Sequence, residues 1–159
     1  MRVAKLIDAI FNFRRLDASV TTSGQPSEEQ IGALADAGVT TVINLGLHDH
    51  ERALPDEAAS VAAAGMRYVH IPVPFDAPDE NHYREFTDAM LATQGEPVHV
   101  HCIMNMRVTA FVYRWLQDRG ASETEARRLM DSVWQPGGPW AAFIGDVERI
   151  DQPHLGPKN

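Results

Sequence analysis

The most informative segment of the sequence is Val98-His99-Val100-His101-Cys102-Ile103-Met104-Asn105-Met106-Arg107-Val108-Thr109. Its opening residues alternate valine and histidine, a pattern that favours a buried strand. From Arg107 to Arg119 apolar side chains recur at helical spacing, and Gly120 follows as a stop signal, so a helix is predicted. A cysteine therefore leaves a strand, passes through a short connection and meets the N-terminus of a helix.

On both sides of this unit, strand patterns alternate with helical patterns along the chain. This alternation predicts βαβ units and hence an α/β fold. We expect one domain over residues 1–159, a three-layer sandwich with a mostly parallel central sheet of about four to five strands and helices on both faces. Strands are predicted within 14–23 and at 39–45, 67–73 and 98–101, and helices at 2–11, 27–38, 55–64, 80–93, 107–119, 122–133 and through 143–147.

Ligands of such folds bind at the carboxyl ends of the strands. Two connections with reactive side chains follow strands and should lie there, residues 102–106 and residues 74–79. The first contains Cys102, and the second contains carboxylates. We therefore expect the functional site at this edge of the sheet.

Composition excludes several classes of function. The 159 residues are 44 % hydrophobic, as in globular chains, and 14 Lys and Arg against 22 Asp and Glu give a net charge of −8. This acidity argues against nucleic acid and anionic membranes as partners, and no apolar run approaches the roughly 20 residues of a membrane span. The single cysteine, Cys102, excludes an internal disulfide and a cysteine-rich zinc site. We expect a cytoplasmic protein whose anionic substrate is met by a local positive site.

The segment after Cys102 has the chemistry of an anion site. Backbone N–H groups of a tight loop and of the first helical turn bind anions, which predicts anion binding by the amides of Ile103, Met104, Asn105 and Met106. Arg107 adds a planar fork that suits two oxygens of a tetrahedral anion. These positive groups favour the thiolate of Cys102, the nucleophilic form.

Three neighbouring side chains have predicted supporting roles. Asn105 occupies the middle of the loop, where a left-handed conformation is needed, and Asn tolerates it better than Met or Ile. His101 is expected to hydrogen-bond the backbone near the loop and to hold the thiolate in place. Thr109, in the first helical turn, is expected to donate its hydroxyl to the sulfur. For His99, a buried histidine of the core is as good an interpretation as a supporting role near the loop.

A cysteine at a strand end is by itself most often a small buried hydrophobe, and an early helical arginine is most often a surface charge. Strand, cysteine, short loop, arginine and helix together favour the catalytic interpretation. The run His48-Asp49-His50-Glu51 is a weaker signal. Adjacent side chains diverge and no distant partner is evident, so we interpret it as a solvated loop and predict no metal site.

The Cys102 segment resembles the signature loop of the cysteine-dependent protein tyrosine and dual-specificity phosphatases. The motif of that superfamily is His-Cys, five residues, Arg, then Ser or Thr; His101-Cys102 and Arg107 fit it, with Thr109 near the hydroxyl position. A bacterial branch of dual-specificity-like phosphatases is similar at three further places, over roughly residues 13–134. They are Ser23-Gly24-Gln25-Pro26-Ser27, Thr41-Val42-Ile43-Asn44-Leu45 and His70-Ile71-Pro72-Val73.

The resemblance implies a phosphatase that needs no metal or cofactor. Cys102 would attack phosphorus and form a phosphocysteine, Arg107 would hold the phosphate oxygens, and the substrate would be a phosphorylated protein or small molecule. A carboxylic acid after the 67–73 strand would protonate the leaving group. Asp76 is the preferred acid; Asp79 is the alternative, although it is also placed to cap the 80–93 helix.

The loop departs from the superfamily pattern in length. Four residues rather than five separate Cys102 from Arg107, and Asn105 replaces a usual glycine. Short loops are also a feature of the rhodanese sulfurtransferases, which would use a Cys102 persulfide. That activity and a non-catalytic phosphate-binding module remain the alternatives to a phosphatase.

Overall fold

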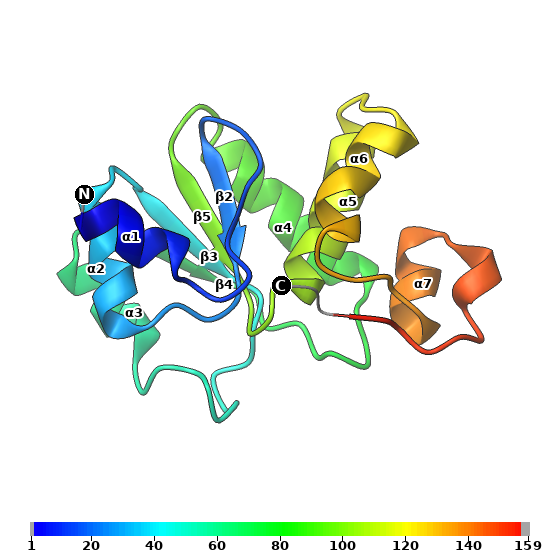
Figure 1. The fold of residues 1–159 in the computed structure, drawn as a ribbon, viewed down its shortest axis with the longest axis horizontal. Helices are drawn as coiled ribbons and strands as arrows, with labels where there is room; N and C mark the ends of the chain where they lie inside the picture. Colours follow the sequence, from blue (N-terminus) through cyan, green and yellow to red (C-terminus); the bar gives the residue numbers. More distant parts are fainter. Residues whose placement is uncertain (1, 157–159) are drawn as a thin grey trace.

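The structure, a computed structural model, describes residues 2–156. Its five strands form one sheet in the order β1-β2-β5-β3-β4, and only β1 runs antiparallel to its neighbour (Figure 1). The predicted α/β class and the mostly parallel sheet are confirmed. The strands are β1 (Arg14–Arg15), β2 (Val20–Ser23), β3 (Thr41–Asn44), β4 (Arg67–His70) and β5 (Val98–His101).

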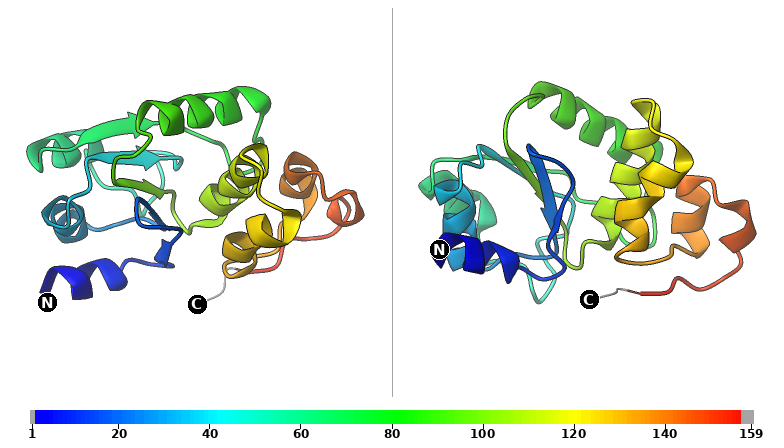
Figure 2. Two further views of the ribbon diagram at one scale, coloured as in Figure 1. Left: turned by 90° about the horizontal axis from the view of Figure 1, so that it is seen from above. Right: turned by 45° about the horizontal axis from the view of Figure 1, so that its top comes forward.

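Helices cover both faces of the sheet, as predicted for a three-layer sandwich. The views in Figure 2 place α4 on one side of the strands and α1 on the other, with α5 to α7 beside the sheet. The helices are α1 (Arg2–Asp8), α2 (Glu28–Asp36), α3 (Glu57–Ala63), α4 (Glu80–Ala92), α5 (Met106–Asp118), α6 (Glu123–Asp131) and α7 (Gly138–Ile144), and the 3₁₀ turn η1 (Val147–Arg149) follows.

Two hydrophobic cores follow from the alternation of side chains along the strands. In β3, Val42 belongs to the core shared with α1, α2 and α3, whereas Ile43 belongs to the core shared with α4, α5 and α6. Both side chains are fully buried. In β5 the valines face the α4–α6 side, and Phe13 stacks on His99 on the opposite face, at 6.1 Å between ring centroids. The sequence VHVH thus has one apolar and one polar buried face.

Some predicted boundaries are wrong by a few residues. The 2–11 helix ends at Asp8, before Asn12 takes a positive φ of 51°. The 14–23 segment, for which a weak strand and a turn are predicted, contains two antiparallel strands. The Asp17 carboxylate accepts the amides of Ser19 and Val20, both at 2.8 Å, and closes the turn between them. Among residues 2–156 no helix has the length and apolar character needed to cross a membrane.

Candidate active site

The cysteine lies at the centre of the sheet's carboxyl edge. Cys102 follows β5, which pairs with β2 on one side and β3 on the other, and Ser23 and Asn44 are the register partners of His101. The connections after these three strands therefore meet around Cys102. This is the edge at which the sequence placed the site.

A cavity of about 760 Å³ opens over the cysteine. Cys102 is 1 % exposed and Arg107 6 % exposed, yet both line it. The walls combine apolar and titratable side chains from four separate segments: Leu47, Asp49, His50, Glu51, Phe75, Ile103, Met104, Met106 and His154.

The loop has the conformation predicted for an anion site. Asn105 is left-handed, with φ 68° and ψ 7°, as expected, and it directly precedes α5. Within the described residues, the amides of Ile103 and Met104 donate to no protein acceptor, so both N–H groups remain for an anion. The first amides of α5 likewise have no acceptor within the helix.

Asn105 also ties the loop to the rest of the protein. Its Nδ2 donates to the Asn12 carbonyl at 2.8 Å and to the Thr22 hydroxyl at 3.0 Å, while Asn12 Nδ2 donates back to the Met104 carbonyl at 3.2 Å. The two left-handed asparagines are thus linked by reciprocal hydrogen bonds, each from a side-chain amide to a backbone carbonyl of the other segment. The role of Asn12 has no local sequence signal, because its partner lies about ninety residues away.

The turn after β2 forms the other support of the loop. The Gln25 amide donates to the Ile103 carbonyl at 2.9 Å. At Gly24 a Cβ atom would lie 2.4 Å from the same carbonyl oxygen, so only glycine fits this close approach. The Ser23–Ser27 turn, singled out in the sequence for its resemblance alone, therefore has a physical reason.

Arg107 is held by the connection that follows β4. Its Nη1 donates to the Val73 carbonyl at 2.8 Å, and its Cζ lies 5.7 Å from the centroid of the Phe75 ring. The bond to Val73 uses one of five guanidinium N–H donors. The side chain is therefore oriented in advance, with donors left for an anion in the cavity.

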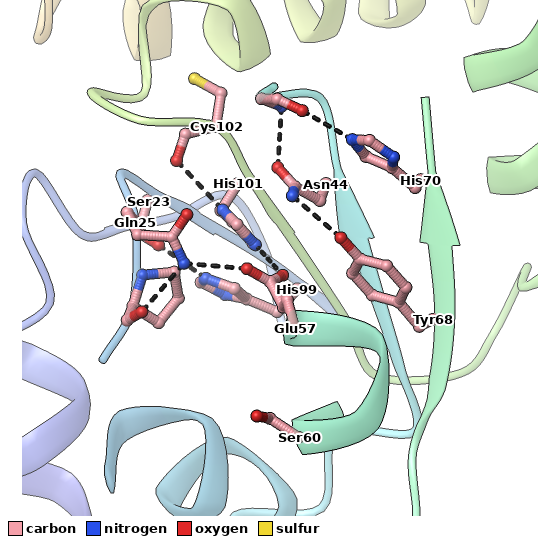
Figure 3. A network of polar contacts seen from close by, with 12 residues as sticks. Ser23, Gln25, Asn44, Glu57, Ser60, Tyr68, His70, His99, His101 and Cys102 are labelled. Atoms are coloured by element: carbon pink, nitrogen blue, oxygen red, sulfur yellow. Dashed lines mark hydrogen bonds and ion pairs between the residues drawn. The ribbon is translucent and has the colours of Figure 1, made fainter. Parts of the chain in front are cut away.

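His101 connects the cysteine to a buried carboxylate (Figure 3). Its Nδ1 donates to the Cys102 carbonyl at 3.0 Å, and its Nε2 pairs with Glu57 Oε2 at 2.6 Å. The other Glu57 oxygen accepts from Gln25 Nε2 at 2.9 Å. The backbone bond predicted for His101 is confirmed; Glu57, on α3, was missed.

Burial of Glu57 acts to raise the pKa of this carboxyl group. The hydrogen bond and the charge of His101, the hydrogen bond from Gln25 and the charge of His48 together outweigh burial, so that the pKa lies below its ordinary value of 4.5. Glu57 is 2 % exposed. A buried carboxylate is therefore kept ionised as the partner of His101, the residue that directly precedes Cys102.

The hydroxyl of Thr109 does not donate a hydrogen bond to the Cys102 sulfur. Thr109 Oγ1 donates to the Met106 carbonyl at 3.0 Å and accepts from Trp134 Nε1 at 3.1 Å. Because a hydroxyl has one proton to donate, the expected bond to Cys102 is wrong. Thr109 supports the first turn of α5 instead.

The predicted acids occupy different places. Asp79 is the N-cap of α4, and its carboxylate accepts a hydrogen bond from the His82 amide at 2.9 Å. This bond holds the carboxylate at the start of the helix. Asp76 is exposed and adjoins Phe75, although it is not itself in the lining of the cavity. The carboxylates that line the cavity are Asp49 and Glu51, from the run interpreted as a solvated loop.

The first residue of that run has a structural role. The His48 and His70 rings stack at 3.8 Å between centroids, and His48 Nε2 lies 2.8 Å from the Tyr68 hydroxyl. His70 Nε2 donates to the Gly46 carbonyl at 2.7 Å. Burial lowers the pKa of His70, and the neighbouring His48 acts in the same direction. These contacts fix the connection after β3 at the rim of the cavity. Among residues 2–156, no three His, Cys, Asp or Glu side chains lie together in a way that could hold a metal ion.

His99 is a satisfied core histidine. Its ring nitrogens lie 2.7 Å from the hydroxyls of Thr21 and Ser23. Burial, with the nearby His101, holds the pKa of His99 well below its ordinary value. This residue stabilises the fold and takes no part in the cavity.

A cysteine after a central parallel strand, a loop of free amides and a preoriented arginine define the class of cysteine-dependent phosphatases. A family model described as "DSP-PTPase phosphatase fused to NAD+ Kinase" matches residues 11–138. The chain belongs to this phosphatase family. A search of curated proteins finds no match.

Solved structures agree with this assignment. A DUF442 protein from Shewanella putrefaciens is 31 % identical, with a TM-score of 0.78 over 91 % of this chain and 95 % of the other. TpbA from P. aeruginosa, solved with pTyr, is 19 % identical, with a TM-score of 0.63 over 89 % and 79 %. The catalytic core of a PP-IP phosphatase from S. cerevisiae is 14 % identical, with a TM-score of 0.69 over 89 % and 91 %. At these lower identities the likeness concerns the fold.

Proposed function

We propose that this protein hydrolyses phosphomonoesters through a phosphocysteine on Cys102. The observation that carries the proposal is the loop itself, in which free amides, a left-handed Asn105 and a preoriented Arg107 surround one cavity-lining thiol. A tetrahedral dianion suits this set of donors. The match to a phosphatase family supports the same chemistry.

The reaction has two steps. The Cys102 thiolate attacks phosphorus, the bond from phosphorus to the leaving oxygen breaks, and that oxygen takes a proton from a carboxylic acid. Water then attacks phosphorus and gives a proton to the same carboxylate, while the sulfur–phosphorus bond breaks and phosphate leaves. Arg107 and the amides of Ile103, Met104, Asn105 and Met106 stabilise the charge on the phosphate oxygens in both steps.

Asp76 is the proposed acid. It adjoins Phe75 on the connection that also holds Arg107 through Val73, and Asp79 is already engaged as a helix cap. Asp76→Asn should lower kcat for alkyl phosphates much more than for activated aryl phosphates, which need little protonation. If Asp49→Asn or Glu51→Gln shows that selective loss while Asp76→Asn does not, the acid comes from the connection after β3 instead.

The proposal is tested by comparing wild type and Cys102→Ser with p-nitrophenyl phosphate and, separately, with thiosulfate and cyanide. Phosphate release by the wild type alone, with a phosphorylated Cys102 peptide after acid quench, is the expected result. Leu91→Ser, at an exposed position on α4, is the matched control and should retain full activity. Turnover of thiosulfate without phosphate release would establish a sulfurtransferase, and phosphate binding without either turnover would establish a binding module.

A further inference from the structure

The C-terminal strap, residues 152–156, returns to the body of the protein. Figure 1 shows this segment, in red, running back past α7 after η1. Leu155 and Gln135 exchange both backbone hydrogen bonds, at 2.9 and 2.7 Å. The strap is therefore paired with the segment between α6 and α7 like a short piece of antiparallel sheet.

Two glycines allow the strap to lie unusually close to its partner segment. A Cβ atom on Gly137 would lie 2.2 Å from the Gln152 carbonyl oxygen, and one on Gly156, where φ is +127°, would lie 2.5 Å from Trp134 Cβ. Arg149 adds hydrogen bonds to carbonyls on both sides, at 2.9 Å to Pro136 and 2.8 Å to Pro153. The position of the strap is thus defined by backbone contacts along its length.

This position brings His154 into the wall of the catalytic cavity. The His154 ring meets the rings of Phe75 and Trp134 edge-on, each at 5.5 Å between centroids. Phe75 in turn lies beside the Arg107 guanidinium, and His154 lines the same cavity as Cys102. A segment fifty residues beyond the nucleophile therefore contributes a side chain to the site.

The distribution of side chains in the cavity indicates which part of a bound substrate lies next to His154. The phosphate group of a substrate is held at the base, by Arg107 and the loop amides. The group esterified to it must then extend toward the outer wall, where Phe75 and His154 offer ring surfaces and His154 also offers a polar nitrogen.

We infer that His154 is a specificity-determining residue, which contacts the organic group of the phosphoester and not its phosphate. This inference rests on the proposed function of the same site. It assigns the strap to the active site and gives a physical reason for the close glycine contacts that hold it there.

The test compares an aryl ligand with inorganic phosphate by their protection of Cys102 from iodoacetamide. His154→Ala should raise the half-protecting concentration of phenylphosphonate, and the KM for phenyl phosphate, about fivefold, as expected for one lost ring contact. Protection by inorganic phosphate should stay within about twofold of the wild type. His154→Phe should restore much of the aryl affinity, and Leu155→Ser, on the exposed side of the strap, should change neither ligand.

The outcomes separate this inference from the proposed function. Equal weakening of both ligands in His154→Ala would show a structural role and overturn the inference, as would no change in either. A wild type that turns over no phosphoester, while phenylphosphonate protection still depends on His154, would overturn the proposed function alone. No protection of wild-type Cys102 by either ligand would overturn both.

Discussion

Two side chains next to Cys102, those of Arg107 and His101, each make a hydrogen bond to a backbone carbonyl. Arg107 donates to the Val73 carbonyl, and His101 donates to the carbonyl of Cys102 itself. Such bonds fix rotamers before a ligand arrives, which is the condition for electrostatic stabilisation without reorganisation. Both side chains are buried, so that their interactions with an anion are little screened by water.

Arg107→Lys tests the need for a planar fork. Lysine keeps the charge, but one ammonium group cannot bind two phosphate oxygens side by side while also reaching the Val73 carbonyl. We expect kcat/KM for p-nitrophenyl phosphate to fall by about 10²-fold or more. Arg114→Lys is the control, because Arg114 pairs with exposed Glu80 at the surface; its activity should be unchanged. Retention of activity within about threefold in Arg107→Lys would contradict the argument.

Glu57→Gln tests the buried pair of Glu57 and His101. Removing the charge leaves His101 without its ionic partner, and breaking a buried pair costs about 3 kcal/mol of unfolding free energy. The folded-state pKa of Glu57 is lowered, so its contribution is present above about 4.5 and is lost as the pH falls further. Urea titrations should show a constant deficit from pH 7 to about 4.5 that shrinks below it.

Glu28→Gln, at an exposed position in the first turn of α2, is the control for this measurement and should show no comparable deficit. A Glu57→Gln deficit that grows as the medium becomes more acidic would have the wrong sign and would contradict an ionised Glu57.

Among the elements, the loop of residues 102–106 is one part of a three-segment junction. The segment after α1, the turn after β2 and the loop after β5 exchange hydrogen bonds through Asn12, Gln25 and Asn105. A loop whose amides point at an anion leaves those amides without protein partners, so it needs support from its carbonyls and side chains. The asparagines and Gln25 provide that support.

Gly24→Ala tests this junction. The new methyl group would lie 2.4 Å from the Ile103 carbonyl oxygen and 2.9 Å from the Phe11 ring, so the loop must move. We expect a loss of about 1–3 kcal/mol in unfolding free energy and about tenfold or more in kcat/KM.

Gly32→Ala is the matched control for this substitution. A Cβ atom there meets nothing within 4 Å, and the position is inside α2, where alanine is about 0.5–1 kcal/mol more favourable than glycine. Thermal unfolding should therefore shift down in Gly24→Ala and up in Gly32→Ala, and kcat/KM should fall only in Gly24→Ala. Normal activity in Gly24→Ala would show that the close approach is not needed.

In the molecule as a whole, two histidines of the sheet, His99 and His70, make the free energy of unfolding depend on pH. The pKa of His99 is held well below its ordinary 6.5 and that of His70 is also lowered, in both cases because burial disfavours the charged ring. The unfolded chain takes up these protons near pH 6.5 and the folded protein does not. Stability should therefore decrease as the pH falls below about 6.5.

The measurement is the unfolding free energy between pH 7 and pH 5. Each histidine contributes a slope of up to about 1.4 kcal/mol per pH unit. His99→Gln should lower stability at pH 7, since bonds to Thr21 and Ser23 are lost, but should make the slope shallower. An unfolding free energy independent of pH over this range would contradict a buried neutral His99.

Sequence patterns predict the α/β class, the strand–cysteine–loop–arginine–helix unit and the left-handed Asn105. These features are local: alternation, helical spacing and the rarity of positive φ act within a few residues. Other features depend on tertiary packing: Glu57 pairs with His101, Gly24 lies against Ile103, Thr109 donates to Met106, and His154 lines the cavity. They depend on which distant segments pack together, because a side chain's partner is set by contact in space and leaves no periodic pattern along the chain.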